Sequence, residues 1–422
     1  MFFNLHSIDC KQVLIMILYA GLVQQLLMSQ GGEEDMSALL VSLHGADIET
    51  DIELKQDILA ALLNTFRESH RARCNFRRAG GFLYLMSVLV SMESFLSPTV
   101  SLESGILRER MHLVQLIFTA FALAMRFEPA NAKLFHQEIC LPSLADTLRL
   151  LGCFSRDKQT IIPFSTNPLT LVRETAAQTE DNIQLFHSIF TASPANVDPL
   201  SYQDKIPFPL VLCVFIFRLL YDLATDNYEK TVPPGGSGLP GSFRSSPRKV
   251  PSPSVVEDAL NSSSTDSANL LNTGSGTTNL SPCTSWNRRS IGSLNLSPPT
   301  PEPVIVHSSV VIVMIKLIPS ISLAISAGEG DNENGDTTRS FWMECLCQLY
   351  CAELVKSLVR NERNQQLMAQ TGLTEEILER CSISLSDESH LLHQPIHYAF
   401  ERVATHYLCA RDLRYVYKIL II

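Results

Sequence analysis

The chain has little positive charge for its length. Among 422 residues, 33 are Lys or Arg and 43 are Asp or Glu, which gives a formal net charge of −10. Proteins that bind nucleic acid usually carry a basic surface, because contacts to phosphate supply most of their affinity. The composition therefore argues against nucleic acid as a partner. A local basic cluster, Arg71, Arg73, Arg77 and Arg78, is interpreted as a solvated helix face or turn.

Paired cysteine motifs are also missing. The 11 cysteines are an odd number and are scattered from Cys10 to Cys409. A structural zinc site needs two C-x2-4-C hooks, often completed by histidine, whereas Cys345, Cys347 and Cys351 have irregular spacings inside a helical pattern. We expect these thiols to pack in a core in their reduced state. Such cysteines are typical of proteins of the cytoplasm or the nucleus.

Long uninterrupted apolar runs are absent. Val13–Val23 ends at two glutamines, Phe208–Phe217 ends at Arg218, and Val304–Ile325 contains charged and proline residues. A membrane-spanning helix needs about 20 nearly continuous apolar residues. The sequence therefore predicts no transmembrane span, and the first run is expected to continue as a helix rather than to act as a targeting segment.

Motifs of catalysis are lacking as well. The patterns G-x-x-x-x-G-K-[ST], H-E-x-x-H and G-x-S-x-G do not occur. His390, His393 and His397 could share a helix face with Glu401 and hold a metal, but Pro395 is expected to interrupt that helix. We therefore predict no catalytic residue, no cofactor and no metal site, and hence no enzyme.

What the sequence does contain is helical periodicity. Apolar residues make up 45% of the chain, which is enough for a substantial core. Helices are predicted at about Asp51–Ser69, Ile106–Met125, Phe341–Val359 and Gln394–Cys409. Val310–Val313 is the main β-like run, although it could equally lie in a helix. The sequence thus indicates an all-α protein.

Spacings of three and four residues predict which helix faces are buried. In Asp51–Ser69, Thr50 and Glu53 have the form of a capping box, and Lys55 falls on the polar face. Pro129 is expected to limit the end of the second helix, which is apolar nearly all round from Leu113. The residues predicted to face inward are Leu54, Ile58, Leu59, Leu62, Leu63 and Phe66 in the first helix, Cys345, Leu346, Leu349, Ala352, Val355 and Val359 in the third, and Ile396, Phe400, Val403 and Tyr407 in the fourth.

Composition divides the chain into three zones. Residues 1–228 and 304–422 show helical pattern, whereas residues 229–303 are rich in Ser, Pro, Gly, Asn and Thr. A segment of that composition cannot bury enough apolar surface to offset its ordering entropy. We predict a disordered linker between two helical regions, which are expected to pack against each other.

The predicted linker contains candidate phosphorylation sites. Five of them precede proline and fit proline-directed kinases, and one follows two arginines and fits a basophilic kinase. A phosphate adds nearly two negative charges and could change how this segment docks. The candidates are Ser246, Ser252, Ser281, Ser290, Ser297 and Thr300.

A repeated pattern overlies the helices. An apolar residue is followed, after four positions, by a small residue and then by an apolar residue that opens a new helix. The copies run from Phe76 to Gly81-Phe82, from Phe135 to Cys140-Leu141, and from Leu367 to Gly372-Leu373. Glycine at this place permits a tight turn between helices. Stacked units of this kind are typical of armadillo or HEAT repeats of about 40 to 47 residues, and a generic helical bundle is the alternative.

Several longer strings are not required by helix or repeat chemistry. They are Arg67–Arg71, Phe76–Phe82, Met125–Phe135, Ser143–Ser155, Glu362–Leu367 and Arg380–Ser382. In the same order, these strings resemble the amino-terminal helical region of the Alfy (blue cheese) family, large BEACH-domain scaffolds with WD repeats and a FYVE finger, and the resemblance covers most of both helical zones. The last residues, 417–422, depart from the family, so the chain is expected to be a fragment or a short form whose second helical zone is truncated.

The resemblance implies a scaffold for selective autophagy of aggregated protein. Its partners would be autophagy machinery or cargo adaptors, and its location would be the cytoplasm, peripheral to autophagic membranes or partly nuclear. Phosphoinositide binding would belong to domains that this sequence does not contain. The alternative is a membrane-associated trafficking adaptor of the BEACH type, using the apolar amino-terminal helix.

Overall fold

The computed structural model describes residues 31–96, 104–155, 176–192, 199–202, 205–228, 302–321 and 336–421, together with Gly21 and Gln25. These residues belong to one compact unit, formed by Met1–Thr231 and Asn295–Ile422. Within these ranges the regular structure is helical throughout, and no strand occurs. The predicted linker and its six candidate phosphorylation sites lie outside the described residues, except for its last two positions.

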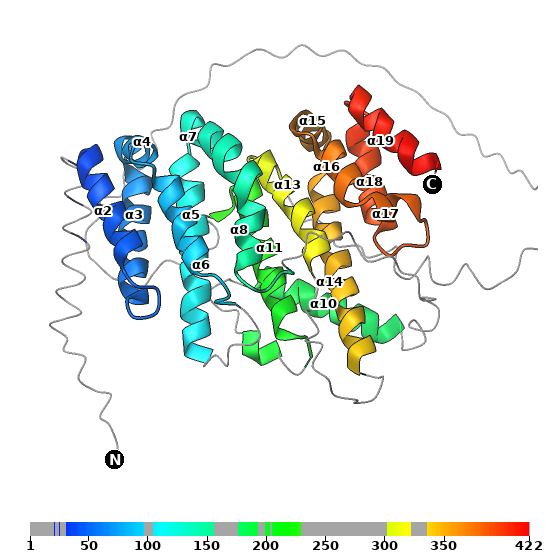
Figure 1. Ribbon diagram of the computed structural model, residues 1–422, viewed down its shortest axis with the longest axis horizontal. Coiled ribbons are helices and arrows are strands. Elements are labelled where there is room, and N and C mark those ends of the chain that lie inside the picture. Colours follow the sequence, from blue (N-terminus) through cyan, green and yellow to red (C-terminus); the bar gives the residue numbers. More distant parts are fainter. Residues whose placement is uncertain are drawn as a thin grey trace, which may run out of the picture. The chain divides into compact units, whose positions relative to one another are not determined.

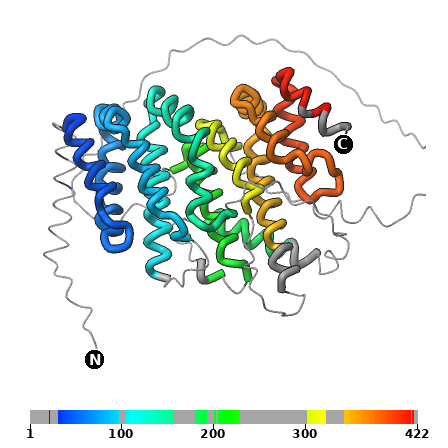
Figure 2. The backbone as a smooth tube through the Cα atoms, viewed as in Figure 1, coloured from blue at the N-terminus to red at the C-terminus, as the bar shows by residue number. Residues whose placement is uncertain are grey.

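The helices of the unit stack side by side, broadly in chain order from α2 to α19 (Figures 1 and 2). Neighbours along the stack contact one another, for example α3 with α6, α11 with α13, and α14 with α18. The elements are α2 (Glu33–Gly45), α3 (Ile52–Glu68), α4 (His70–Arg78), α5 (Gly81–Ser91), α6 (Ser104–Met125), α7 (Pro129–Leu134), η1 (Phe135–Leu144), α8 (Ala145–Leu150), α10 (Ala176–Thr191), η3 (Pro199–Tyr202), α11 (Phe208–Thr225), α13 (Ser308–Leu317), η5 (Ile318–Ser320), α14 (Asp336–Leu358), α15 (Glu362–Thr371), α16 (Leu373–Arg380), α17 (Ser382–Ser386), α18 (His393–Ala404) and α19 (Ala410–Ile421).

A short helix, a second helix and a longer helix recur along the stack. The set α4, α5 and α6 near the amino terminus matches the set α15, α16 and α18 near the carboxyl terminus. Apolar helix faces are buried between neighbouring helices along the stack, which gives a core that extends along it. The predicted all-α solenoid is confirmed.

Two glycine turns join the first helix of a set to the second. Gly80 and Gly372 have φ angles of 72° and 88°, a left-handed conformation that glycine adopts without steric cost. Four positions before each glycine lies a fully buried residue, Phe76 or Met368. The predicted register of the third copy was therefore one residue off, because Leu367 is only half-buried.

The second predicted copy contains no turn. Residues 129–150 run as one rod through α7, η1 and α8, and η1 is a π-helix with Pro142 inside it. Proline has no backbone N–H and crowds the carbonyl of the preceding turn. A wider π-helical segment accommodates such a disruption without ending the helix. Cys140 therefore lies buried inside this rod rather than at a turn.

Two buried asparagines, Asn131 in α7 and Asn364 in α15, connect these helices by hydrogen bonds to segments that precede them in the chain. Asn131 donates to the backbone oxygens of Ala124 and Arg73, at 2.8 and 3.0 Å. Asn364 occupies the matching place and donates to the oxygens of Leu358 and Pro303, at 2.7 and 2.8 Å. Both side chains are almost completely buried, and the bonds to Ala124 and Leu358 satisfy carbonyls at the ends of α6 and α14.

Helix α3 departs from its predicted face at two neighbouring residues. Leu54 is 46% exposed, whereas Lys55 is 1% exposed and donates from Nζ to the Leu43 oxygen at 2.6 Å. Lys55 thereby satisfies a carbonyl in the last turn of α2, and this hydrogen bond offsets part of the cost of burying its ammonium group. The predicted capping box is wrong, because the N-cap is Asp51 and its side chain accepts no cap hydrogen bond.

The other predicted helices are largely confirmed. Pro129 follows α6 and opens α7, and the predicted inward residues of α14, from Cys345 to Val359, are all buried. Val310–Val313 lies in the helix α13. In α18, Phe400 is only half-buried, and Tyr407 lies beyond the helix end with 58% of its surface exposed.

Helix α11 is a long, strongly apolar helix. By length and composition it could cross a membrane, but 78% of its apolar window is buried inside the unit. It contacts α10, α13 and α14, and it contains a buried ion pair between Arg218 and Asp222 at 2.7 Å. These contacts are those of a core helix.

The two helical regions contact each other directly, as expected. The backbone N–H groups of Val306 and His307 both donate to the Ala224 oxygen, at 2.8 and 3.0 Å. In addition, Arg149 donates to Ser320 Oγ at 2.8 Å and to the Lys316 oxygen at 2.7 Å. The predicted linker is thus inserted between two helices, α11 and α13, that lie side by side (Figure 1).

Candidate functional site

The cysteines and histidines named from the sequence form no metal cluster in the described part of the chain. Cys345, Cys347 and Cys351 are buried in α14, and burial raises the pKa of the Cys345 and Cys351 thiols well above its usual range. Such thiols are inert packing groups.

The second set of possible metal ligands considered from the sequence is His390, His393, His397 and Glu401. Their side chains do not gather around a common point. His390 is 3% exposed and accepts from the Leu392 N–H, while His393 bonds the Ser384 oxygen and its ring stacks on His397. Pro395 does not interrupt α18, because it lies in the first turn of the helix, where its missing N–H costs nothing.

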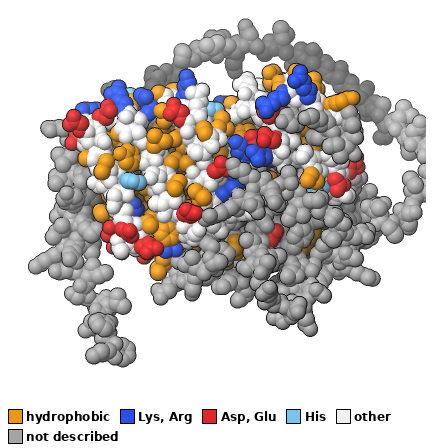
Figure 3. All heavy atoms as spheres, in the orientation of Figure 1, with side chains coloured by type: hydrophobic (Ala, Val, Ile, Leu, Met, Phe, Trp, Pro, Cys, Tyr) orange, Lys and Arg blue, Asp and Glu red, His pale blue; other side chains and the backbone are white. Residues whose placement is uncertain are grey.

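Helix α4 carries exposed basic side chains along one edge, Arg71 and Arg78. Ser69 caps it, accepting from the Ala72 N–H at 3.1 Å, and the left-handed Gly80 follows its end. Phe76 anchors the buried side of the helix. Arg71 and Arg78 are exposed on the opposite side and take part in none of the ion pairs found among the described residues. Basic side chains gather over α4 at the edge of the face shown in Figure 3.

One member of the predicted basic cluster is not solvated. Arg73 is 8% exposed, and its Nη1 donates to the Phe66 oxygen at 2.5 Å while its Nε donates to Glu128 Oε1 at 3.2 Å. Glu128 lies in the turn between α6 and α7 and is 5% exposed. A buried carboxylate needs a charged partner, and Arg73 of α4 supplies it.

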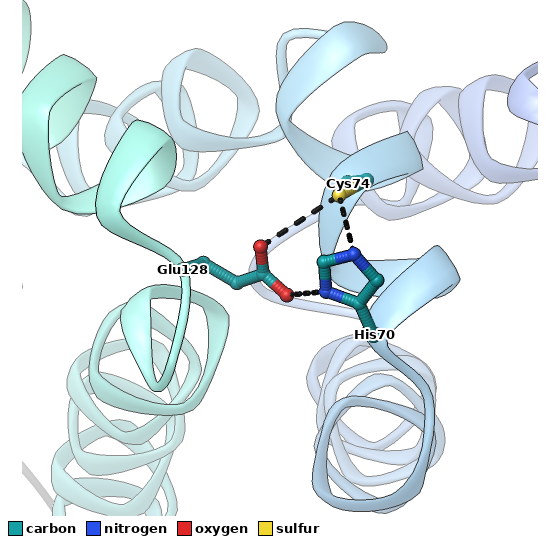
Figure 4. A group of neighbouring side chains, drawn as sticks. All are labelled: His70, Cys74 and Glu128. Atoms are coloured by element: carbon teal, nitrogen blue, oxygen red, sulfur yellow. Dashed lines mark hydrogen bonds and ion pairs between the residues drawn. The ribbon is translucent and has the colours of Figure 1, made fainter.

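Glu128 also contacts the exposed side of α4. His70 and Cys74 lie one helical turn apart, so both side chains reach the same carboxylate. Glu128 Oε1 meets His70 Nδ1, and Oε2 lies 3.7 Å from Cys74 Sγ (Figure 4). Cys74 Sγ is 3.8 Å from His70 Nε2. One donor atom from each residue lies within 4.8 Å of the others.

A shallow pocket of about 450 Å³ opens beside this cluster. His70 and Cys74 form part of its wall, and Glu33 from α2 forms another part. The pocket is lined by Gly32, Glu33, His70, Arg71, Cys74, Asn75 and Arg78. Burial and the nearby Glu128 charge raise the pKa of the Cys74 thiol, so the free thiol is protonated at neutral pH. The site therefore offers protonatable donors within a basic rim.

Sequence reasoning missed this cluster because Glu128 is 54 residues from Cys74. Only the helical stacking brings α4 and the α6–α7 turn together. A local signal did exist, since His70 and Cys74 are spaced four residues apart in a stretch of helical pattern. Two such residues alone carry little information about a metal site.

Phe127 is the most exposed large apolar residue of the described chain. It is 83% exposed and has a φ of 57°, which is rare for a bulky side chain. The Arg126 guanidinium lies 5.5 Å from the centre of its ring. The turn therefore directs an aromatic ring into solvent immediately before the buried Glu128.

Comparison with known proteins agrees with the helical architecture. Residues 33–171 match a family model described as armadillo-like repeats. Together with the stacked helices, this match identifies the fold as an all-α solenoid of armadillo type. Repeats of this class are typical of scaffolds without enzymatic activity.

Two curated relatives are similar to a larger part of the chain than the repeat family model matches. The chain is 24% identical over 374 residues to WD repeat- and FYVE domain-containing protein 4 of Homo sapiens, and 21% identical over 378 residues to the Mus musculus protein of the same name. Each alignment covers 88% of this chain and 10% of the relative. The chain thus spans about a tenth of the length of these relatives. No solved structure matches the chain.

Proposed function

We propose that the chain is a non-catalytic scaffold segment that binds other proteins along the edge formed by α4 and the α6–α7 turn. The observation that carries this proposal is the exposure of Arg71, Arg78 and Phe127 on a rigid stack of helices. Arginine and aromatic residues are enriched where binding energy concentrates in protein interfaces. The armadillo-like fold supports the same function, because solenoids offer long surfaces for partners.

The chemistry of this edge favours an acidic partner segment with at least one apolar side chain. Arg71 and Arg78 would bind carboxylates or phosphates, for which the guanidinium fork is suited. Phe127 would pack against the apolar side chain, because an exposed ring gains most from burial. Electrostatic attraction of this kind is weakened by salt.

The proposal is tested with the double variant Arg71→Glu/Arg78→Glu. Partners captured by the wild-type chain are identified by quantitative mass spectrometry, and the strongest is then purified and titrated directly. We expect its affinity to fall at least tenfold in the edge variant and to weaken with added salt. The control is Arg363→Glu/Arg414→Glu, which makes the same charge change at exposed positions of α15 and α19. Equal loss of affinity in both variants would show that binding does not depend on the edge formed by α4 and the α6–α7 turn.

A finer proposal concerns the cellular role. The resemblance to Alfy-type scaffolds implies a part in selective autophagy of aggregated protein, and the similarity to WD repeat- and FYVE domain-containing protein 4 supports the likeness to a protein with WD repeats and a FYVE domain. The partners would then be autophagy machinery or cargo adaptors, and the location would be cytoplasmic. Removing residues 33–155 from the full protein should slow the lysosomal turnover of an aggregated reporter. Unchanged turnover, with the protein still expressed, would reject this role.

The trafficking-adaptor alternative is tested by flotation with liposomes. The amino-terminal apolar run that this alternative would use lies, except for Gly21, outside the described residues. The described helix that is long and apolar enough to cross a membrane, α11, is mostly buried in the core, which favours the protein-binding scaffold. We expect the chain to remain in the bottom fraction.

Phosphorylation of the segment 229–303 is a separate proposal. Mass spectrometry of this segment from dividing cells tests it at Ser246, Ser252, Ser281, Ser290, Ser297 and Thr300.

A further inference from the structure

The cluster of His70, Cys74 and Glu128 has no part in the proposed protein-binding function. Packing does not require it either, because Arg73 already neutralises Glu128 from the buried side of α4. The Cys74 thiol faces the other carboxylate oxygen from 3.7 Å, a long contact for a weak donor. A half-exposed thiol, an exposed imidazole and a buried carboxylate therefore converge for a reason that the helix stack does not supply.

The donor set matches the ligands of one metal. Zinc accepts Cys sulfur, His nitrogen and carboxylate oxygen in a tetrahedral site, whereas Mg²⁺ and Ca²⁺ select oxygen ligands only. The three donor atoms are already within 4.8 Å of one another, and small side-chain rotations would place them around one ion. A structural zinc ion has four ligands, so a fourth group, Glu33 on the wall of the adjacent pocket or a water molecule, would complete the coordination.

The surrounding charge is compatible with a divalent cation. A Cys74 thiolate and the Glu128 carboxylate carry two negative charges that face the two positive charges of Zn²⁺. Because Glu128 is already ionised and Cys74 loses a proton on binding, the ion adds one net positive charge beside Arg71, Arg73 and Arg78. Arg73 would remain on Glu128 Oε1 and orient it, as second-shell partners of metal-bound carboxylates do. The remaining oxygen, Oε2, faces Cys74 (Figure 4).

We infer that His70, Cys74 and Glu128 bind a zinc ion that joins helix α4 to the turn between α6 and α7. The ion would hold the turn that precedes α7 against α4. Its role is structural, and it requires neither the acidic partner nor the edge contacts of the proposed function.

Cobalt provides the first test, because Co²⁺ bound to a thiolate gives a sulfur-to-metal charge-transfer band and tetrahedral coordination gives intense visible bands. The full chain is stripped with a chelator and titrated with Co²⁺, and Zn²⁺ is then added. We expect both bands to saturate at one equivalent and to disappear when Zn²⁺ displaces Co²⁺. Absence of a charge-transfer band in the wild-type chain would overturn the inference.

Variants locate the site. Cys74→Ser should abolish the charge-transfer band, and His70→Ala should weaken Co²⁺ binding at least tenfold, whereas Cys409→Ser should leave both unchanged. Cys409 is a suitable control because it is the other half-buried free cysteine among the described residues. If the band persists in Cys74→Ser, the metal is held elsewhere and the inference fails.

A stability readout separates a bridging ion from loose binding. Zinc at a hundredfold excess over its dissociation constant should raise the melting temperature of the wild-type chain by about 5 °C. Cys74→Ser and His70→Ala alter side chains at the surface, so both should fold and melt like the metal-free wild type, without response to zinc. An equal zinc response in these variants would contradict a site that joins α4 to the α6–α7 turn.

Discussion

Gly81 shows how closely two helices approach at a single residue. A Cβ atom at this position would overlap the ring of Phe76, which is fully buried. The neighbouring Gly80 has open space around it but a positive φ. Glycine is therefore required twice in succession, first for backbone conformation and then for close packing.

Gly81→Ala should accordingly destabilise the chain. The added methyl must displace an aromatic ring in a packed core, which costs about 1 to 3 kcal/mol. Unfolding in urea, followed by circular dichroism, measures the change. The control Gly105→Ala lies in α6 with nothing near its position and should leave stability unchanged or slightly raised. Equal effects of the two substitutions on the free energy of unfolding would show that the close contact with Phe76 does not make Gly81→Ala more destabilising.

His390 is a buried histidine that the fold keeps neutral. Its side chain is 3% exposed, and its Nδ1 accepts the Leu392 N–H at 3.1 Å. Burial lowers the pKa of His390 to about 4, and nearby Asp387 opposes this shift while His393 adds to it. The folded state thus binds this proton more weakly than the unfolded chain, whose histidine pKa is about 6.5.

The free energy of unfolding should therefore fall as pH drops from about 6.5 toward about 4, by up to about 3 kcal/mol from His390 alone. Above pH 6.5 the histidine is neutral in both states and contributes no pH dependence. His390→Gln should flatten the slope in that window, whereas His397→Gln, at an exposed position, should leave it unchanged. Urea unfolding at a series of pH values measures both, and identical slopes would contradict the assignment.

At the scale of elements, an extended segment joins distant helices. Residues 302–307 lie against α11 through the Ala224 oxygen and against α15 through Asn364. Asn364 Oδ1 also accepts the Ile305 N–H at 3.0 Å. One buried amide thus holds both the segment and the Leu358 end of α14.

Asn364→Ala should release this segment. Loss of three hydrogen bonds leaves buried backbone groups unpaired, at a cost of about 3 kcal/mol. Amide hydrogen exchange should speed up at Ile305 and Val306 more than in α11. Gln366→Ala, an exposed change in the same helix, should exchange like the wild type. Uniform acceleration across the chain would instead indicate global destabilisation.

At the scale of the whole molecule, the two helical regions form one stack although residues 229–301 separate them in sequence. The hydrogen bonds to Ala224 bring the ends of the intervening stretch close together. Loop closure costs little more for a long loop than for a short one, about 0.6 kcal/mol for each doubling. The fold therefore does not depend on the length of this stretch.

Replacing residues 232–294 by a few Gly and Ser residues should preserve the stack. We expect the free energy of unfolding to rise by about 1 kcal/mol, because the loop closed on folding is several times shorter. Thermal melting of the purified variant measures this change. A large loss of stability or a second melting transition would show that the stretch contributes contacts of its own.

Helix positions and most buried faces could be predicted because periodicity is a local property of the chain. Ile58, Leu62 and Phe66 face inward as their spacing predicts. The failures occur where a partner from elsewhere decides the environment. Lys55 is buried because it reaches the last turn of α2, and Tyr407 is exposed because α18 ends before it.

The sequence by itself determined the all-α class, the positions of the main helices and the glycine turns, since these depend on neighbours within a few residues. The tertiary structure alone decided which polar residues meet. Arg73 and Cys74 lie on α4, whereas Glu128 lies in the turn between α6 and α7, and only stacking brings them together. Stacking is set by the summed burial of whole helix faces, so no short stretch of sequence carries the information for that cluster.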